Sequence, residues 1–326
     1  MTVGAAVIGL GNVGMGYDYE CVDDSKILTH TMAYHHHPAF KLVAGVDLDA
    51  GRRRAFEEKF AAPAFPSVEE LNREGGFEVV SIAVPTEYHY DVFLEALAGG
   101  VKGAVIEKPM ARTLRECREM KSRAESVECV LMVNFIRRYE PGAIKLRKAI
   151  ASGEIGSIYK GIVWYSGGIA NNGSHAVDLL ISLLGEAGRM RLLSPGQAQG
   201  LDDRSPDLVI DFGGIPVYFL ASGDSEPALM EIELMGTTGS VRYGDAGETI
   251  TVRRTESDPL FPECVTLQRV GKTTHTDLAR YQYHVIEALN CRLRGVSESQ
   301  MNDGNVLDTA IVLDGIADMC KEAACE

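Results

Sequence analysis

The first 135 residues alternate short apolar runs with longer stretches that have apolar residues at helical spacing. In residues 89–98, for example, Val92, Phe93 and Ala96 share one helical face. The motif Thr113-Leu114-Arg115-Glu116 is a capping box that predicts the start of another helix. Strands that alternate with helices predict a doubly wound parallel sheet. Five apolar runs are each short enough for one buried strand: residues 4–8, 41–46, 79–84, 103–106 and 129–133.

The hydrophobic period changes after about residue 155. Residues 228–235 alternate, with Glu231 and Glu233 on one face, which is typical of an antiparallel sheet with one polar side. Helices at about 277–294 and 305–321 close the chain, and the second carries an apolar stripe that needs a partner: Val306, Ala310, Leu313 and Ala317. The other predicted strands are residues 157–166, 208–212, 217–221, 240–243 and 249–254.

These patterns predict an α/β protein of two domains. We expect an N-terminal Rossmann dinucleotide-binding domain over residues 1–126 and a C-terminal α+β domain with a mainly antiparallel open sheet over residues 127–303. No flexible linker precedes the final helix, so we expect residues 304–326 to fold back onto the first domain.

Composition excludes several classes of partner. The chain has 326 residues, with 32 Lys and Arg against 46 Asp and Glu, a net charge of −14 that argues against nucleic acid or an anionic membrane surface. No apolar run reaches the length of about 18 residues needed for a membrane span, and the apolar start lacks the basic segment of a signal peptide. The seven cysteines are scattered without a Cys-x-x-Cys, which favours a reducing cytoplasm and no cysteine metal site.

A glycine motif follows the first predicted strand. Gly9-Leu10-Gly11-Asn12-Val13-Gly14 has the G-x-G-x-x-G spacing that lets backbone approach a pyrophosphate. Asp47 ends the second strand, where a carboxylate can accept hydrogen bonds from the adenosine ribose. Its charge disfavours a 2′-phosphate and so favours NAD over NADP, unless Arg52 or Arg53 binds that phosphate instead of simply opening the next helix.

The segment between this motif and Asp47 is longer than usual. Asp47 lies 33 positions after Gly14, against about 20 in the common pattern. We interpret the excess as an insertion from Met15 to about Ser25 at the cofactor-side rim of a cleft, with Tyr17 as a candidate cleft aromatic. The consecutive residues 35–37 are all histidine and cannot share one helix face, so a solvated helix end is a better interpretation than a metal site.

Two further stretches carry candidate catalytic side chains. Glu107-Lys108-Pro109 follows the strand at residues 103–106, and ligands of open α/β sheets bind at the carboxyl ends of strands. His175 and Asp178 lie three apart at the start of an apolar helix that ends near residue 185, so they share a face. Each also has a structural interpretation: a solvated loop lysine, a histidine near a helix start and a surface carboxylate.

Taken in order, these motifs resemble the glucose–fructose oxidoreductase / inositol dehydrogenase / MocA family. The resemblance covers most of residues 3–185 and implies a nicotinamide-dependent dehydrogenase for a sugar, polyol or sugar derivative. It implies that Lys108 and His175 face the nicotinamide, and that homodimers or homotetramers form through the open sheet. The motifs are Gly9-x-Gly11-x-x-Gly14, Pro85-Thr86 with His89, Glu107-Lys108-Pro109, Asn134 with Arg137-Arg138-Tyr139 and Pro141, and Gly173-Ser174-His175 with Asp178.

The resemblance also assigns roles to individual residues. The expected substrate contacts are Asn171, Asp178, Arg137 and Tyr17. The expected cofactor contacts are Gly9, Gly11, Asn12, Val13, Gly14, Asp47, Pro85, Thr86, His89, Glu107 and Lys108.

One position departs from the family pattern. Many members carry an aspartate four residues before the histidine, where this chain has Asn171. An amide is not a base, so a three-residue proton relay is in doubt, and Lys108 and His175 remain as the acid–base pair. Two other functions stay open: an NAD-dependent glycosidase of the same fold and a non-enzymatic dinucleotide-binding sensor. The aromatics Tyr139 and Trp164 fit either a cleft or the core. Substrate, direction of reaction and oligomer number are not determined by the sequence.

Overall fold

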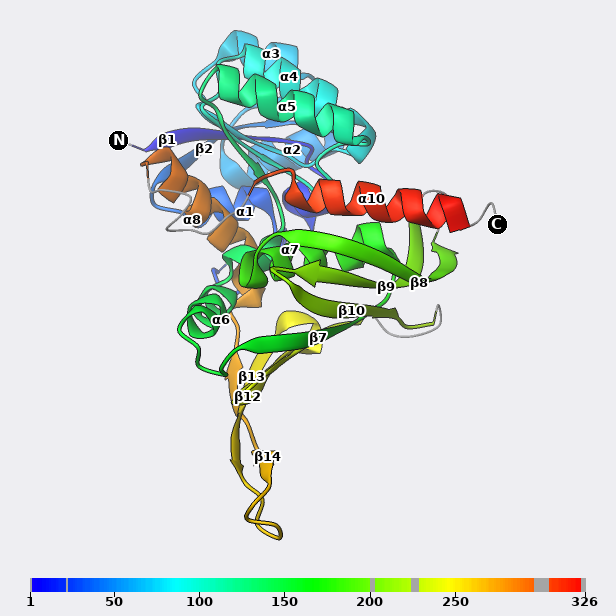
Figure 1. Ribbon diagram of the computed structural model, residues 1–326. Helices are drawn as coiled ribbons and strands as arrows, with labels where there is room; N and C mark the ends of the chain where they lie inside the picture. Colours follow the sequence, from blue (N-terminus) through cyan, green and yellow to red (C-terminus); the bar gives the residue numbers. More distant parts are fainter. Residues whose placement is uncertain (1, 22, 200–202, 224–228, 296–304, 324–326) are drawn as a thin grey trace. The chain divides into compact units, whose positions relative to one another are not determined.

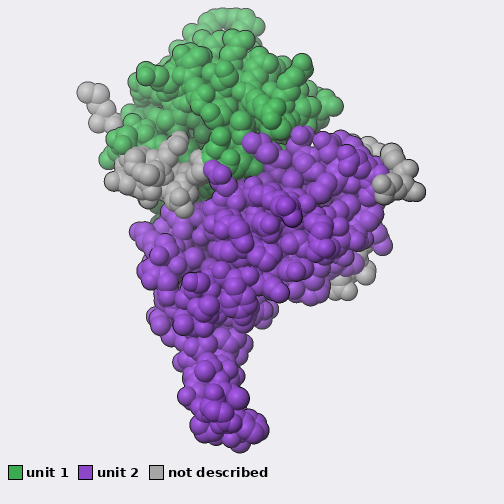
Figure 2. Space-filling view, viewed as in Figure 1, with its two compact units in different colours: residues 1–139, 279–310 green, residues 140–278, 311–326 purple. Residues whose placement is uncertain are grey.

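The chain forms two compact units (Figure 2). Unit 1 comprises residues 1–139 and 279–310, and unit 2 comprises residues 140–278 and 311–326. The predicted boundaries at residues 126 and 304 therefore differ from the observed ones. The computed structural model describes residues 2–21, 23–199, 203–223, 229–295 and 305–323.

Unit 1 is built on a parallel sheet. Among its described residues, six strands pair in the order β3-β2-β1-β4-β5-β6. All residues of β4 and β5 are buried, as expected where helices cover both faces of a sheet. This is the Rossmann arrangement that the sequence predicted. The strands are β1 (Val3–Ile8), β2 (Phe40–Val46), β3 (Ala64–Phe65), β4 (Val79–Ile82), β5 (Gly103–Ile106) and β6 (Val130–Val133).

Helices pack on both faces of this sheet (Figure 1). Alternate residues of β1 point to opposite sides: Ala6 and Ile8 belong to one apolar cluster, Ala5 and Val7 to the other. α3, α4 and α5 contribute to the first cluster, and α1, α2 and α8 to the second. The predicted capping box at Thr113 is confirmed at the start of α5. The helices are α1 (His30–His36), α2 (Ala50–Phe60), α3 (Val68–Glu74), α4 (His89–Ala98), α5 (Leu114–Ser126) and α8 (Tyr281–Leu293).

Helix α8 belongs to unit 1, although the sequence interpretation assigned it to the second domain. Its residues Val285, Ile286 and Leu289 are buried in one cluster with Val79 and Val105 of the parallel sheet. The physical reason is that a parallel sheet of apolar strands needs cover on both faces, and residues 1–139 do not supply all of it.

Unit 2 contains a mixed, mostly antiparallel sheet. Within its described residues, strands pair in the order β14-β13-β12-β11-β7-β10-β9-β8, β15 pairs with β13, and β7 with β10 is the parallel pair. One face packs on α6 (Pro141–Ala151) and α7 (Ser174–Leu184). The strands are β7 (Ile158–Tyr165), β8 (Ala187–Gln199), β9 (Asp203–Phe212), β10 (Ile215–Ala221), β11 (Met230–Gly236), β12 (Gly239–Gly244), β13 (Thr249–Ser257), β14 (Val265–Leu267) and β15 (Lys272–His275).

Residues 254–270, here called the arm, continue β13 and β14 as a narrow hairpin that projects from the body of unit 2 (Figures 1 and 2). The last residue of β13 that pairs with β12 is Arg254, so beyond this point β13 has lost that neighbour.

The final helix, α10 (Asp308–Ala323), packs on a different unit from the one that the sequence predicted. Val312, Ile316 and Cys320 lie in the apolar core of unit 2, whereas the prediction placed the whole helix on the dinucleotide domain. The predicted stripe was out of register, since Ala317 is exposed. Within residues 305–323, the segment around Leu307 packs in the core of unit 1.

Candidate functional site

The glycine motif follows β1 and runs into a wide helical turn at Asn12–Gly16. Gly9 has φ +95°, and a Cβ there would lie 2.5 Å from the Ala83 carbonyl oxygen. A Cβ on Gly14 would lie 1.9 Å from the Gly9 oxygen. By contrast, a Cβ on Gly11 would meet only the Arg52 guanidinium, at 3.9 Å. Gly9 and Gly14 thus serve close backbone packing, whereas Gly11 leaves a bare strip of backbone open to a ligand.

A shallow pocket of about 270 Å³ lies at this bare backbone. Helix α1 begins at His30, so residues 17–29 lie between the glycine turn and this helix, and they include most of the predicted insertion from Met15 to about Ser25. Tyr19, from this segment, forms part of the wall. The pocket is lined by Leu10, Gly11, Asn12, Met15, Gly16, Tyr19, Gly51, Arg52 and Ala55.

Asp47 follows β2 at the edge of the pocket. Its carboxylate accepts hydrogen bonds from Leu10 N and Asp49 N, each at 2.8 Å. The Arg52 guanidinium lies 3.5 Å away, and its side chain is 54% exposed against 9% for Asp47. Arg53 instead donates to the backbone oxygens of Asp47 and Leu48. A carboxylate offers about four acceptor positions, so these contacts leave Asp47 capacity for ribose hydroxyls. The open Gly11 backbone and this acceptor fit a dinucleotide.

The ends of β4 and β5 are tied together by His89. Its Nδ1 lies 2.9 Å from the Pro109 oxygen and its Nε2 2.9 Å from the Val84 oxygen. The ring is buried, so the structure gives it a role in holding the two strand ends rather than a surface for the cofactor. Pro85 and Thr86 follow Val84 directly, and Thr86 opens a short helical turn beside them.

Glu107, immediately before Lys108, belongs to a closed ring of buried polar side chains. His30 Nε2 lies 2.9 Å and Asn134 Nδ2 lies 2.5 Å from Glu107 Oε1. Gln282 completes the ring, because its Oε1 is 3.0 Å from Asn134 Nδ2 and its Nε2 is 2.9 Å from His30 Nδ1. These contacts are mutually consistent when His30 carries its proton on Nε2 and Glu107 is ionised.

The ring fixes the ionisation of Glu107. Burial alone raises the pKa of this carboxyl, but the hydrogen bonds from His30 and Asn134 and the charge of Lys108 outweigh it and hold the pKa below its usual value. Lys108 itself is half-buried at the end of β5. Its neighbour on the chain is therefore a fixed anion. Sequence reasoning missed the contributions of His30 and Gln282, because no local pattern links positions so far apart.

Tyr281, at the start of α8, is influenced electrostatically by other predicted residues of unit 1. Burial raises the pKa of its hydroxyl, with further contributions from the negative charges of Glu107 and Asp18 and from Tyr17, while Arg137 lowers it. The hydroxyl donates to the Leu28 oxygen at 2.7 Å. Tyr17, Arg137 and Glu107 thus all act electrostatically on one tyrosine, whereas Tyr139 is buried in the core.

Asp18 organises the insertion and was also missed by the sequence. Its buried carboxylate accepts from Leu28 N at 2.6 Å, Thr29 N at 3.0 Å and the Thr29 hydroxyl at 2.5 Å. Thr29 in turn caps α1. The insertion is therefore anchored to the helix that carries His30.

In unit 2 the predicted residues gather at the start of α7. His175 is half-buried in the first turn, and Asp178, one turn on, is buried, so its interpretation as a surface carboxylate is wrong. Asn171 lies in the preceding wide turn, Gly168–Gly173, and is exposed. The position of α7, Ser174–Leu184, agrees with the apolar helix that the sequence predicted.

Asp203, on β9, holds this turn. Its carboxylate accepts from Ala170 N at 2.9 Å, Asn171 N at 3.0 Å and Arg204 N at 2.8 Å. These bonds fix the backbone that leads into His175. The sequence contained no signal for this role, because Asp203 lies on a strand far along the chain.

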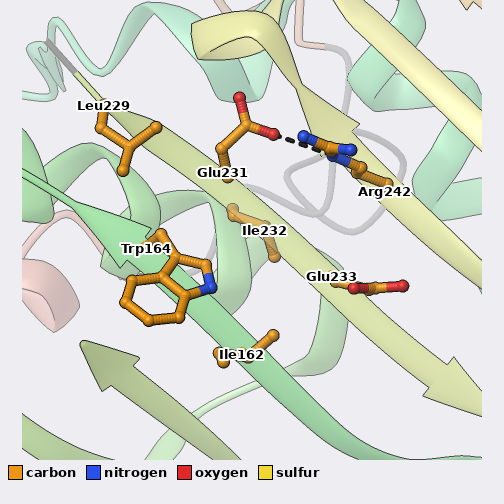
Figure 3. A pocket seen from close by; sticks show the side chains of 7 residues that line it. All are labelled: Ile162, Trp164, Leu229, Glu231, Ile232, Glu233 and Arg242. Carbon is orange, nitrogen blue, oxygen red and sulfur yellow. Dashed lines mark hydrogen bonds and ion pairs between the residues drawn. The ribbon is translucent and has the colours of Figure 1, made fainter. Parts of the chain in front are cut away.

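Trp164 lies outside the core, on the open face of the unit 2 sheet, where it is 44% exposed. It lines a pocket of about 300 Å³ in which an apolar floor meets the Glu231–Arg242 ion pair (Figure 3). The other lining residues are Ile162, Leu229, Ile232 and Glu233. The core interpretation of Trp164 is therefore wrong.

Across the described ranges, no helix has both the length and the hydropathy needed to cross a membrane. Within the same residues, no three His, Cys, Asp or Glu side chains are grouped so that they hold a metal ion, and His35 and His36 instead make an edge-to-face ring contact.

Comparison with known proteins assigns the first part of the chain. Residues 3–135 match the family described as oxidoreductase family, NAD-binding Rossmann fold, in the GFO/IDH/MocA group. Residues 3–135 are thus similar to the NAD-binding domain of that oxidoreductase family. Inositol 2-dehydrogenase of Salmonella typhimurium is 31% identical over 159 residues, 48% of this chain and 44% of the relative. The scyllo-inositol 2-dehydrogenase (NAD⁺) of Bacillus subtilis is 28% identical over 269 residues, 74% of each chain.

Solved structures extend the similarity of fold over nearly the whole chain. The WlbA dehydrogenase of Bordetella pertussis, solved with NADH and UDP-GlcNAcA, has a TM-score of 0.77 at 19% identity and covers 99% of this chain and 96% of its own. The transcriptional regulator Gal80p of Kluyveromyces lactis has a TM-score of 0.74 at 15% identity, covering 98% and 88%. These identities show a shared fold, and the presence of a regulator among them shows that this fold also serves other functions.

Proposed function

We propose that this chain is an NAD-dependent oxidoreductase that transfers a hydride between the cofactor and a hydroxyl carbon of a sugar, polyol or sugar derivative. The observation that carries the proposal is the carboxyl edge of the parallel sheet in unit 1. There the open Gly11 backbone lies beside Asp47, and Lys108 ends a strand of the same sheet. The inositol dehydrogenases among the relatives support the class of substrate.

The proposed roles follow from the chemistry of the side chains. NAD, when bound on Gly9–Gly14 and Asp47, supplies the hydride acceptor. The Lys108 ammonium stabilises negative charge on the carbinol oxygen, and His175 accepts the hydroxyl proton. The buried Asp178 orients His175 or the substrate, whereas Asn171 contributes hydrogen bonds only. Arg137 and Tyr17, near Tyr281, contact the substrate.

The choice of cofactor is part of the proposal. Asp47 places a negative charge beside the open backbone, which disfavours the 2′-phosphate of NADP. Arg53 is engaged with backbone oxygens, which leaves Arg52 as the nearer cation. We therefore expect NAD to bind more tightly than NADP.

A screen of substrates tests the function. The purified chain would first be titrated with NAD and with NADP, and then assayed for reduction of the bound cofactor with inositols, free sugars and nucleotide sugars. Net reduction with one of these classes supports the dehydrogenase. Release of an aryl group from a glycoside without net reduction would support the glycosidase instead. Cofactor binding without turnover on any panel member would support the sensor.

Self-association through the open face of the unit 2 sheet completes the proposal. This face carries the Trp164 pocket of Figure 3, with exposed apolar area beside an ion pair, which is the composition of many protein interfaces. Light scattering coupled to size-exclusion chromatography tests it directly. A mass of one chain at all concentrations would rule it out.

A further inference from the structure

The arm of unit 2 presents a cluster of apolar side chains to solvent. Leu260 is 76%, Phe261 58%, Val265 72% and Val270 85% exposed. All four lie within residues 254–270, the projecting hairpin of Figures 1 and 2. Apolar side chains gathered on one exposed segment mark a surface that another molecule covers.

The tip of the arm has a defined shape. Asp258 Oδ1 accepts hydrogen bonds from Leu260 N at 2.8 Å and Phe261 N at 3.0 Å. Asp258 N donates to the Cys264 oxygen at 2.9 Å, and Cys264 N to the Phe261 oxygen at 2.8 Å. These bonds hold Leu260 and Phe261 at the end of the hairpin before any partner arrives. Such preorganisation lowers the entropy cost of docking.

The same unit carries a receiving surface of matching chemistry. The Trp164 pocket has apolar lining from Ile162 and Leu229, and its volume of about 300 Å³ suits a bulky apolar side chain (Figure 3). Glu233 lies at its rim, and the arm carries the oppositely charged Arg269 next to Val270.

A chain cannot place its own tip in its own pocket while the sheet is intact. The pocket lies on β7, β11 and β12, and the tip lies beyond Arg254, the last residue of β13 that pairs with β12. At about 3.3 Å per residue, Phe261 reaches some 20 Å further along the strand direction. Two copies related by a two-fold axis instead give each tip a pocket on the partner.

We propose that two copies of this chain exchange arms, with Leu260 and Phe261 of each copy inserted into the Trp164 pocket of the other. This proposal rests on the self-association proposed above and specifies its contacts. It is independent of the redox reaction.

Trp164 is the single tryptophan of the sequence and Cys264 is exposed, so energy transfer between them tests the contact. The acceptor chain carries Trp164→Phe, has Cys21, Cys291 and Cys325 changed to Ser, and is labelled with dansyl on Cys264. It is mixed with unlabelled wild-type chain, so any transfer from tryptophan to dansyl arises between copies. We expect transfer that disappears when excess unlabelled Trp164→Phe chain is added.

Charged tips supply the matched comparison. Leu260→Glu with Phe261→Glu should raise the dimer dissociation constant at least tenfold and abolish the transfer, whereas Val127→Glu, an exposed apolar position in unit 1, should change neither. Circular dichroism checks that each variant is folded. A monomeric wild-type chain overturns both self-association and arm exchange. A wild-type dimer that gives no energy transfer, and whose dissociation constant is unchanged by Leu260→Glu with Phe261→Glu, overturns arm exchange alone.

Discussion

Lys108 follows the carboxyl end of β5, and His175 lies in the first turn of α7. In the proposed reaction both handle the proton or the charge of the carbinol oxygen. We therefore expect Lys108→Ala and His175→Ala each to lower turnover by about 100-fold or more, the usual scale for lost acid–base catalysis. Dinucleotide affinity should change much less.

Steady-state kinetics with the substrate found by the screen, and a cofactor titration, check this pair of variants. Lys102→Ala, at an exposed lysine paired with Glu78, is the control. If His175→Ala keeps near-normal turnover, His175 is not the base and Lys108 remains the candidate.

Asp47 gives a second prediction at this scale. Its carboxylate is the negative charge beside the open backbone at Gly11, and it also holds Leu10 N. Asp47→Ser should weaken NAD binding and reduce the preference for NAD over NADP, with Arg52 then facing the phosphate. Titrations of both cofactors measure the ratio. A wild-type chain that binds NADP more tightly would contradict the electrostatic argument.

Glu107 links stability to pH. Its pKa in the folded chain lies below the ordinary value of 4.5, so the folded state binds this proton less readily than the unfolded state. Its contribution to the free energy of unfolding is therefore fully present above that ordinary value and is lost as the pH falls through the folded pKa. We expect the wild-type chain to lose stability over this acid range more steeply than Glu107→Gln. Denaturant unfolding at a series of pH values makes the comparison, and parallel curves would remove Glu107 as the cause.

At the scale of elements, the turn before α7 depends on Asp203. Asp203→Ala removes the acceptor of three backbone N–H groups, two in partly buried bonds and one in an exposed bond, and should cost about 1–3 kcal/mol in all. We expect faster amide hydrogen exchange in Gly168–Gly173 and a smaller change elsewhere. Asp211→Ala, on the same strand, is the control. Unchanged protection of the Ala170 and Asn171 amides from exchange would show that the turn is stable without Asp203.

The elements that sequence reasoning found are those with a strong local pattern. The parallel strands other than β3 were predicted because each is a short apolar run, as in Val79–Ile82, whereas β3 was missed because it is only Ala64–Phe65. β8 was missed because Pro195 and Gly196 interrupt it and its pairing with β9 shifts register repeatedly. The candidate site divides in the same way: Gly11, Lys108 and His175 stand in contiguous motifs, whereas Gln282 acts only through tertiary contact.

At the scale of the whole molecule, we expect the stability of unit 2 to depend on the packing of α10. Because Ile316 is fully buried in the core of unit 2, Ile316→Ala should lower the free energy of unfolding of that unit by about 2–5 kcal/mol. Trp164, which lies in unit 2, reports its unfolding by fluorescence. Ala317→Ser, at the exposed neighbour, should have little effect. Equal effects of both substitutions would mean that α10 does not pack as described.

The return of α8 to unit 1 has a consequence for synthesis of the chain. A ribosome completes all the described strands of the parallel sheet by Val133, but adds Tyr281–Leu293 only after it has made the strands of unit 2. During that interval Val79, Val105 and Met132 lack the apolar cover that α8 later provides. Growing chains with uncovered apolar faces are those that chaperones bind. Nascent chains stalled after residue 139 has left the ribosome should therefore retain a bound chaperone, and chains extended far enough to expose residue 293 outside the ribosome should release it.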